Sequence, residues 1–122
     1  MTEIMINPAK QSISIEVKSE SLQPLEFKIV VYESDGSTII EEFKGNNKLQ
    51  TSFIKPLKMK PTEYKGKYVR GTFNFKSADE KDFIYAACFG VLEDDIALKP
   101  DICMKGNTTN GKVTVLEEFH LV

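Results

Sequence analysis

The chain has 122 residues and a formal net charge of −2, with sixteen basic and eighteen acidic side chains. This length suits one domain with a core of its own, so we expect a single domain over residues 1–122. The slightly acidic balance gives no general attraction to nucleic acid or to an anionic membrane surface. We therefore expect neither of them as a partner.

The first predicted strand is residues 11–18, where apolar and polar side chains alternate as in a half-buried strand. Residues 25–33 and 37–44 follow as an antiparallel hairpin. Pairing Val31 with Ile39 places Phe27 opposite Phe43, Lys28 opposite Glu42 and Glu26 opposite Lys44, whereas a slip of one residue would mix charge into the apolar face. Residues 34–36 then form the loop, with Gly36 at its positive-φ position.

Further strands are predicted at residues 49–53, 68–76, 82–92, 101–105 and 112–122. Pro56 and Pro61 make a helix improbable between residues 55 and 67, so an edge strand or a long crossing loop is expected there. Residues 93–100 are predicted to form an acidic loop and residues 106–111 a polar turn ending in Asn-Gly. About seven to eight strands without a helical period predict an all-β, antiparallel β-sandwich, with immunoglobulin-like and jelly-roll-like topologies both open.

Residues 68–76 and 82–92 are expected to pair with each other, because that register stacks aromatic side chains on one face. It places Phe75 opposite Phe83, Phe73 opposite Tyr85 and Tyr68 opposite Gly90. The segment 83–92 is apolar on both faces, which is typical of a strand covered on both sides. We expect its second face, including Ile84, Cys88 and Leu92, to be covered by the N-terminal segment or by another subunit.

The two cysteines, Cys88 and Cys103, are too few for a disulfide-rich framework, and we expect no four-ligand metal site from them. Cys88 lies within an apolar run, which favours a small buried side chain. The first residues lack the basic and apolar regions of a signal peptide, and no segment has the roughly 18 apolar residues of a membrane helix. These features favour a reducing, cytoplasmic location, unless a leader has been removed.

Catalytic and metal-binding motifs are weak. His120 is the only histidine, and no Gly-x-Ser-x-Gly motif accompanies it, so we expect no enzyme. Asp94, Asp95 and Asp101 lie close together in sequence and offer the oxygen ligands that Ca²⁺ prefers, but they do not follow the EF-hand spacing. A solvated acidic loop is the favoured interpretation.

Residues 55–76 combine seven basic side chains with Tyr64 and Tyr68, a local pattern typical of proteins that bind single-stranded nucleic acid or another polyanion. Lysines on an edge strand also block edge-to-edge aggregation, and we favour that interpretation. The residues predict a non-catalytic binding or assembly module without a cofactor, which presents a surface to a protein partner or to itself. Its expected contact residues are Ile84, Cys88, Leu92, Tyr64, Tyr68 and Arg70. The alternative is a small-ligand or carbohydrate-binding sandwich that uses its end loops, with Ca²⁺ as a weak candidate.

Overall fold

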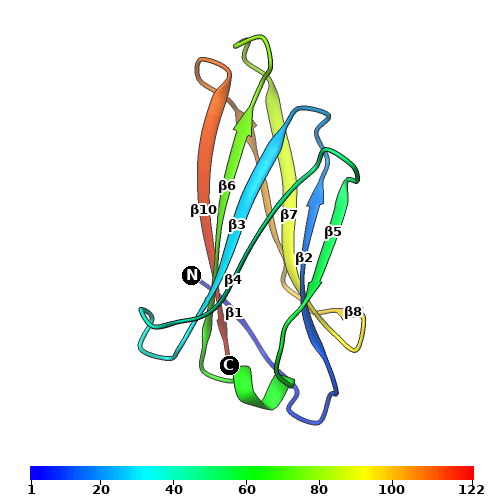
Figure 1. Ribbon diagram of the computed structural model, residues 1–122, viewed down its shortest axis with the longest axis vertical. Helices are drawn as coiled ribbons and strands as arrows, with labels where there is room; N and C mark the ends of the chain where they lie inside the picture. Colours follow the sequence, from blue (N-terminus) through cyan, green and yellow to red (C-terminus); the bar gives the residue numbers. More distant parts are fainter.

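A computed structural model describes residues 1–122 as two five-stranded sheets packed face to face (Figure 1). The predicted β-sandwich is confirmed, with ten strands in place of seven to eight. Sheet A has the order β1-β10-β6-β3-β4, and sheet B has the order β5-β2-β7-β8, with β9 also paired to β7. Pairing is antiparallel except between β1 and β10. The strands are β1 Thr2–Ile4, β2 Ile13–Ser19, β3 Leu25–Tyr32, β4 Ile39–Asn46, β5 Ser52–Pro56, β6 Tyr68–Lys76, β7 Ile84–Glu93, β8 Ile96–Ala97, β9 Ile102–Asn107 and β10 Lys112–Leu121.

The core lies between the two sheets and is built from the apolar faces that the sequence predicts. Ile13, Ile15 and Val17 of β2 are buried, as predicted from their alternation. Opposite them, Val69, Phe73 and Phe75 of β6 are buried as well. Such interdigitated apolar side chains are what hold two sheets together.

The structure contains no helix with the length and apolar character of a membrane span.

The predicted pairing of residues 68–76 with residues 82–92 is wrong. β6 pairs with β3 and β10 in sheet A, while β7 lies in sheet B beside β2, β8 and β9. The aromatic faces do meet, but they meet across the sandwich: the ring centroids of Phe75 and Tyr85 are 4.8 Å apart, and those of Phe73 and Phe89 are 5.2 Å apart. Alternation identifies an apolar face, and it does not say whether the facing residues are beside it or across the core.

The hairpin of β3 and β4 forms, with Gly36 at a φ of 74°, but its register differs by two residues from the predicted one. Phe27 lies opposite Gly45, and Lys28 lies opposite Lys44. Between Phe27 and Val31 a shift of two leaves the inward and outward faces unchanged, and the ring of Phe27 then covers the bare backbone of Gly45. The Lys28–Glu42 ion pair still forms at 2.8 Å, as a diagonal contact.

A bulge in this hairpin places a carboxylate inside the sandwich. The register shifts between Val31 and Tyr32, so Ile39 faces solvent and Glu41 points inward, 8% exposed. Glu41 accepts hydrogen bonds from the Tyr64 hydroxyl and from the backbone N–H of Lys58 at 3.0 Å. These hydrogen bonds connect β4 to the segment between β5 and β6, which crosses from sheet B to sheet A.

Residues 55–67, predicted as an edge strand or a long crossing loop, contain the end of β5 and the loop that crosses to β6. β5 forms the edge of sheet B, and a single 3₁₀ turn at Pro61–Tyr64 interrupts the loop that follows. The predicted strand start at Leu49 is wrong, because that side chain is 99% exposed in the loop before β5.

Two two-residue turns have positive φ at both positions, one between β9 and β10 and one between β7 and β8. Asn110 and Gly111 have φ of 57° and 73°, as an Asn-Gly turn of type I′ requires. Asp94 and Asp95 also have positive φ, 48° and 65°, so the start of the predicted acidic loop is a two-residue turn between β7 and β8.

Candidate functional site

A row of large side chains crosses the outer face of sheet A. His120, Tyr68, Tyr32 and Ile39 lie directly opposite one another on β10, β6, β3 and β4. The rings of Tyr68 and His120 are stacked with centroids 4.3 Å apart. The only histidine is therefore stacked on an aromatic ring of the neighbouring strand.

Arg70 occupies the next position of this face. Its guanidinium lies 4.5 Å from the centroid of the Tyr32 ring, and its Nη2 is 2.6 Å from Oε2 of Glu118. The hydrogen bond to Glu118 raises the pKa of Arg70 above its usual value. Both Arg70 and Tyr68 are therefore ordered on the surface. Tyr64, which we expected beside them, is fully buried.

The outer edge of β10 is unpaired over most of its length. β1 pairs only with Phe119–Leu121, at the lower end of β10 (Figure 1). Residues 112–118 therefore have a neighbouring strand on the β6 side but none on the β1 side. Leu121 exchanges backbone hydrogen bonds with Gly66 and Lys67 on the β6 side, whereas Lys112 bonds with Thr109 on the outer side. Since directions alternate along a strand and the β10–β6 register has no bulge, the N–H and C=O groups of Thr114 and Leu116 point out of this edge.

The other edges of the sandwich carry protective features. β4 is bulged, β5 contains Lys55 and Pro56, and β9 has Lys105 in its middle. β1 has only three residues and β8 only two. Bulges, prolines, lysines and short length are the usual means of preventing strand addition. Residues 113–117 of β10 have none of these four features. Their one charged side chain is Glu117, on the inner face between Val115 and Phe119, and Leu116 is 65% exposed beside the free edge.

The outer face of sheet B contains the apolar residues expected to contact a partner. Ile84 is 61% exposed there, but Leu92 is only 6% exposed. Leu92 lies between Ser14 on β2 and Ala97 on β8, so its cover comes from within the sheet. The N-terminal segment, expected to cover this face, places β1 beside β10 in sheet A.

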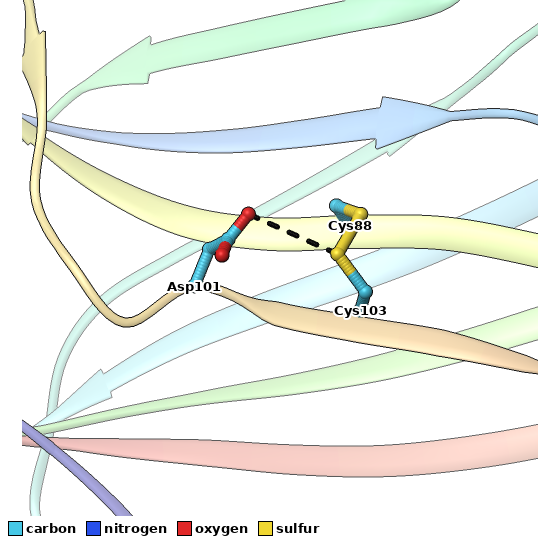
Figure 2. Close-up of side chains that lie close together, drawn as sticks. All are labelled: Cys88, Asp101 and Cys103. Atoms are coloured by element: carbon cyan, nitrogen blue, oxygen red, sulfur yellow. Dashed lines mark hydrogen bonds between the residues drawn. A yellow bond between two sulfur atoms is a disulfide. The ribbon is translucent and has the colours of Figure 1, made fainter.

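Cys88 and Cys103 form a disulfide between directly opposed positions of β7 and β9 (Figure 2). The expectation of an unbonded, buried Cys88 is therefore wrong. The cytoplasmic prediction also loses part of its basis, because disulfides persist mainly in oxidising compartments. The sequence alone did not show the pairing, since it depends on β9 lying next to β7.

The three aspartates considered as Ca²⁺ ligands, Asp94, Asp95 and Asp101, do not form one cluster. Oδ1 of Asp94 accepts the backbone N–H groups of Gln11 and Ser12, both at 2.9 Å, and these bonds lower the pKa of Asp94. Asp101 lies instead beside the disulfide. The metal-capable side chains whose ligand atoms lie within 4.8 Å of one another are Cys88, Asp101 and Cys103, a group without Asp94 or Asp95.

A shallow polar hollow lies over β3, β4 and β6 on sheet A. Its lining residues are Glu26, Phe27, Lys28, Lys44, Gly45, Asn46, Thr72 and Asn74. The outer face of sheet A therefore presents hydrogen-bonding, charged and aromatic side chains that a partner molecule could contact.

Searches among protein families, curated proteins and solved structures find no match to this chain.

Proposed function

We propose that this protein is a non-catalytic assembly module that binds a second copy of itself through the free edge of β10. The observation that supports this proposal is the unprotected edge at residues 113–117, which offers the outward N–H and C=O groups of Thr114 and Leu116. A second strand satisfies such groups by β-sheet addition. Two copies then share one continuous sheet.

The edge is complementary to itself in the antiparallel direction. With Val115 on the two-fold axis, Thr114 lies opposite Leu116 of the second copy, so the two residues with outward backbone groups pair with each other. The same register brings Lys112 near Glu118 of the second copy, which joins opposite charges at both ends. Met1 lies next to Leu116 and Glu118, is 76% exposed, and has to move aside.

The contact is expected to be weak. About four backbone hydrogen bonds, each contributing roughly 0.5–1.5 kcal/mol net, are added to the burial of the exposed Leu116 side chains. Against this stands the loss of translational and rotational freedom on association. We therefore expect a dissociation constant of about 10 μM to 1 mM. Because of the disulfide, we place this assembly in an oxidising compartment.

Sedimentation velocity between micromolar and millimolar concentrations tests the proposal. The wild type should show concentration-dependent dimerisation, and Leu116→Lys should remain monomeric. A lysine at this position stays in water and obstructs strand addition, while the fold is retained because the side chain is already 65% exposed.

Ile84→Lys is the matched control, because it makes the same change at a similarly exposed position, 61%, on sheet B. It should dimerise like the wild type. A wild type that stays monomeric at millimolar concentration contradicts the proposal. Loss of the dimer in Ile84→Lys but not in Leu116→Lys also contradicts it, and assigns assembly to the face of sheet B.

A further inference from the structure

We propose that Cys88, Cys103 and Asp101, together with Glu20, bind a divalent metal of the zinc class when the disulfide is reduced. This site lies on the outer face of sheet B, whereas the proposed assembly edge belongs to sheet A, so the two proposals are independent. Figure 2 shows Asp101 directed toward the paired cysteines. The ligand atoms of these three residues lie within 4.8 Å of one another.

Two carboxylates flank the disulfide, one at each sulfur. Oδ2 of Asp101 is 3.8 Å from Sγ of Cys103, and Oε1 of Glu20 is 3.3 Å from Sγ of Cys88. A disulfide sulfur carries no hydrogen, so both approaches, including the dashed one in Figure 2, are contacts of acceptor atoms in which no proton is shared. Between the sulfurs and the carboxylate oxygens there is no donor, and a cation placed among them would be attracted by all of them.

The backbone holds both carboxylates near the cysteines without help from the disulfide. The N–H of Glu20 donates to the carbonyl oxygen of Ala86 at 2.9 Å, which fixes Glu20 beside β7. Asp101 lies over Gly90, where a side chain on the glycine would meet the Asp101 Cβ at 3.4 Å. The ladder between β7 and β9 aligns Cys88 with Cys103 through its own pairing. These contacts remain when the sulfur–sulfur bond is cleaved.

Reduction supplies the missing ligands. A thiol reductant donates two electrons, the sulfur–sulfur bond breaks, and two thiols and an oxidised reductant result. The metal then binds both sulfurs as thiolates and releases their two protons. The two thiolates and Asp101 supply three of the four ligands that Zn²⁺ takes in tetrahedral sites. Glu20, 3.3 Å from the Cys88 sulfur but outside this close group, has to turn toward the metal to supply the fourth. Lys99, whose Nζ is 3.8 Å from Oδ1 of Asp101, forms only an exposed ion pair and competes weakly.

The experiment titrates reduced and oxidised protein with Co²⁺, a spectroscopic probe for tetrahedral zinc sites, and then displaces it with Zn²⁺. The reduced wild type should bind one Co²⁺ with a thiolate charge-transfer band, and the oxidised protein should show no such band. Asp101→Asn and Glu20→Gln should each weaken Zn²⁺ binding by about tenfold or more. Asp95→Asn is the matched control and should leave the affinity within about twofold.

Circular dichroism of the reduced protein shows whether the sheets persist, because unfolded cysteines also bind metals. The proposal is overturned if the reduced wild type binds Zn²⁺ no more tightly than the Cys88→Ser/Cys103→Ser double variant. It is equally overturned if Asp101→Asn and Glu20→Gln both retain the wild-type affinity, because the thiols alone would then account for binding.

Discussion

The buried Tyr64–Glu41 pair provides the most direct test of how the sandwich is held together. Tyr64 is fully buried, donates its hydroxyl to Glu41, and accepts the backbone N–H of Met59 at 3.0 Å. Tyr64→Phe keeps the ring and removes only the oxygen. The variant leaves one oxygen of a buried carboxylate and one backbone N–H without their partner.

The expected cost follows from these two groups. A buried donor or acceptor left unsatisfied costs about 1–3 kcal/mol, and more when it is charged. We therefore expect Tyr64→Phe to lower the free energy of unfolding by roughly 2–5 kcal/mol. This is a large part of the ~5–15 kcal/mol that stabilises an ordinary domain.

The same pair predicts a pH dependence. Burial, and then the hydrogen bond to Glu41, raise the pKa of Tyr64 well above its usual value near 10. Below about pH 10 the tyrosine is neutral in the folded and in the unfolded state, and its contribution to stability is fully present. Above it, only the unfolded chain ionises this residue, so stability falls as pH rises, approaching about 1.4 kcal/mol per pH unit.

Urea denaturation at several pH values between 8 and 11 measures both effects. The stability difference between the wild type and Tyr64→Phe should be largest at pH 8 and should shrink by roughly 1 kcal/mol between pH 10 and 11. Tyr85→Phe, at a half-buried tyrosine, is the control and should show a smaller loss. A loss below about 1 kcal/mol at pH 8, or a difference that does not change with pH, would refute the reasoning.

Two further predictions concern the core and the first hairpin. Phe73→Ala should destabilise by roughly 3–5 kcal/mol in chemical denaturation, because the ring is fully buried, and a loss below 1 kcal/mol would contradict this. The Asp35 carboxylate accepts hydrogen bonds from the Thr38 side chain and from the backbone N–H groups of Thr38 and Ser37, which lower its pKa to about 2. Its contribution is present above pH ~4 and is lost as pH falls through 2. An NMR titration giving an ordinary value near 3.9 would show that these bonds do not persist in solution.

The sequence was sufficient to predict the architecture, because alternation and turn chemistry are local. Residues 13–17 and 69–75 show their buried faces directly, and Gly36 and Gly111 mark positions that need positive φ. Apart from the hairpin of β3 and β4, the sequence did not predict which strands are neighbours. β6 and β7 follow each other along the chain and have matching aromatic faces, yet they belong to different sheets.

The register of the first hairpin was mispredicted for a related reason. Opposite charges at Lys28 and Glu42 attract across a direct pair or across a diagonal one, and an exposed ion pair contributes only about 0–1 kcal/mol. The fit of Phe27 over Gly45 and the bulge that buries Glu41 depend on the whole core. Charge therefore identified the partner strand without identifying the register.

Among the expected contact residues, Tyr68 and Arg70 are half-buried on the outer face of sheet A, whereas Tyr64, expected with them, is fully buried. Tyr64 lies three residues after Pro61 in a lysine-rich segment, so its sequence neighbours do not distinguish it from an exposed tyrosine. Its burial depends on Glu41, which the bulge turns inward from a distant strand. The disulfide likewise depends on a strand pairing that the sequence leaves open.

Identifying the edge of β10 as the least protected one requires both the sequence and the sheet topology. From sequence alone, residues 112–122 are an ordinary alternating strand, and the topology alone shows several edges of equal standing. The features that protect an edge are local, so they can be assessed once the edges are known. Each of the other edges, β1, β4, β5, β8 and β9, has a bulge, a proline, a lysine or a short length, whereas residues 113–117 of β10 have only the charge of Glu117. An edge that lacks all of these features exposes unpaired backbone groups to any complementary strand, and the strand that is always available to this protein is the same segment of another copy.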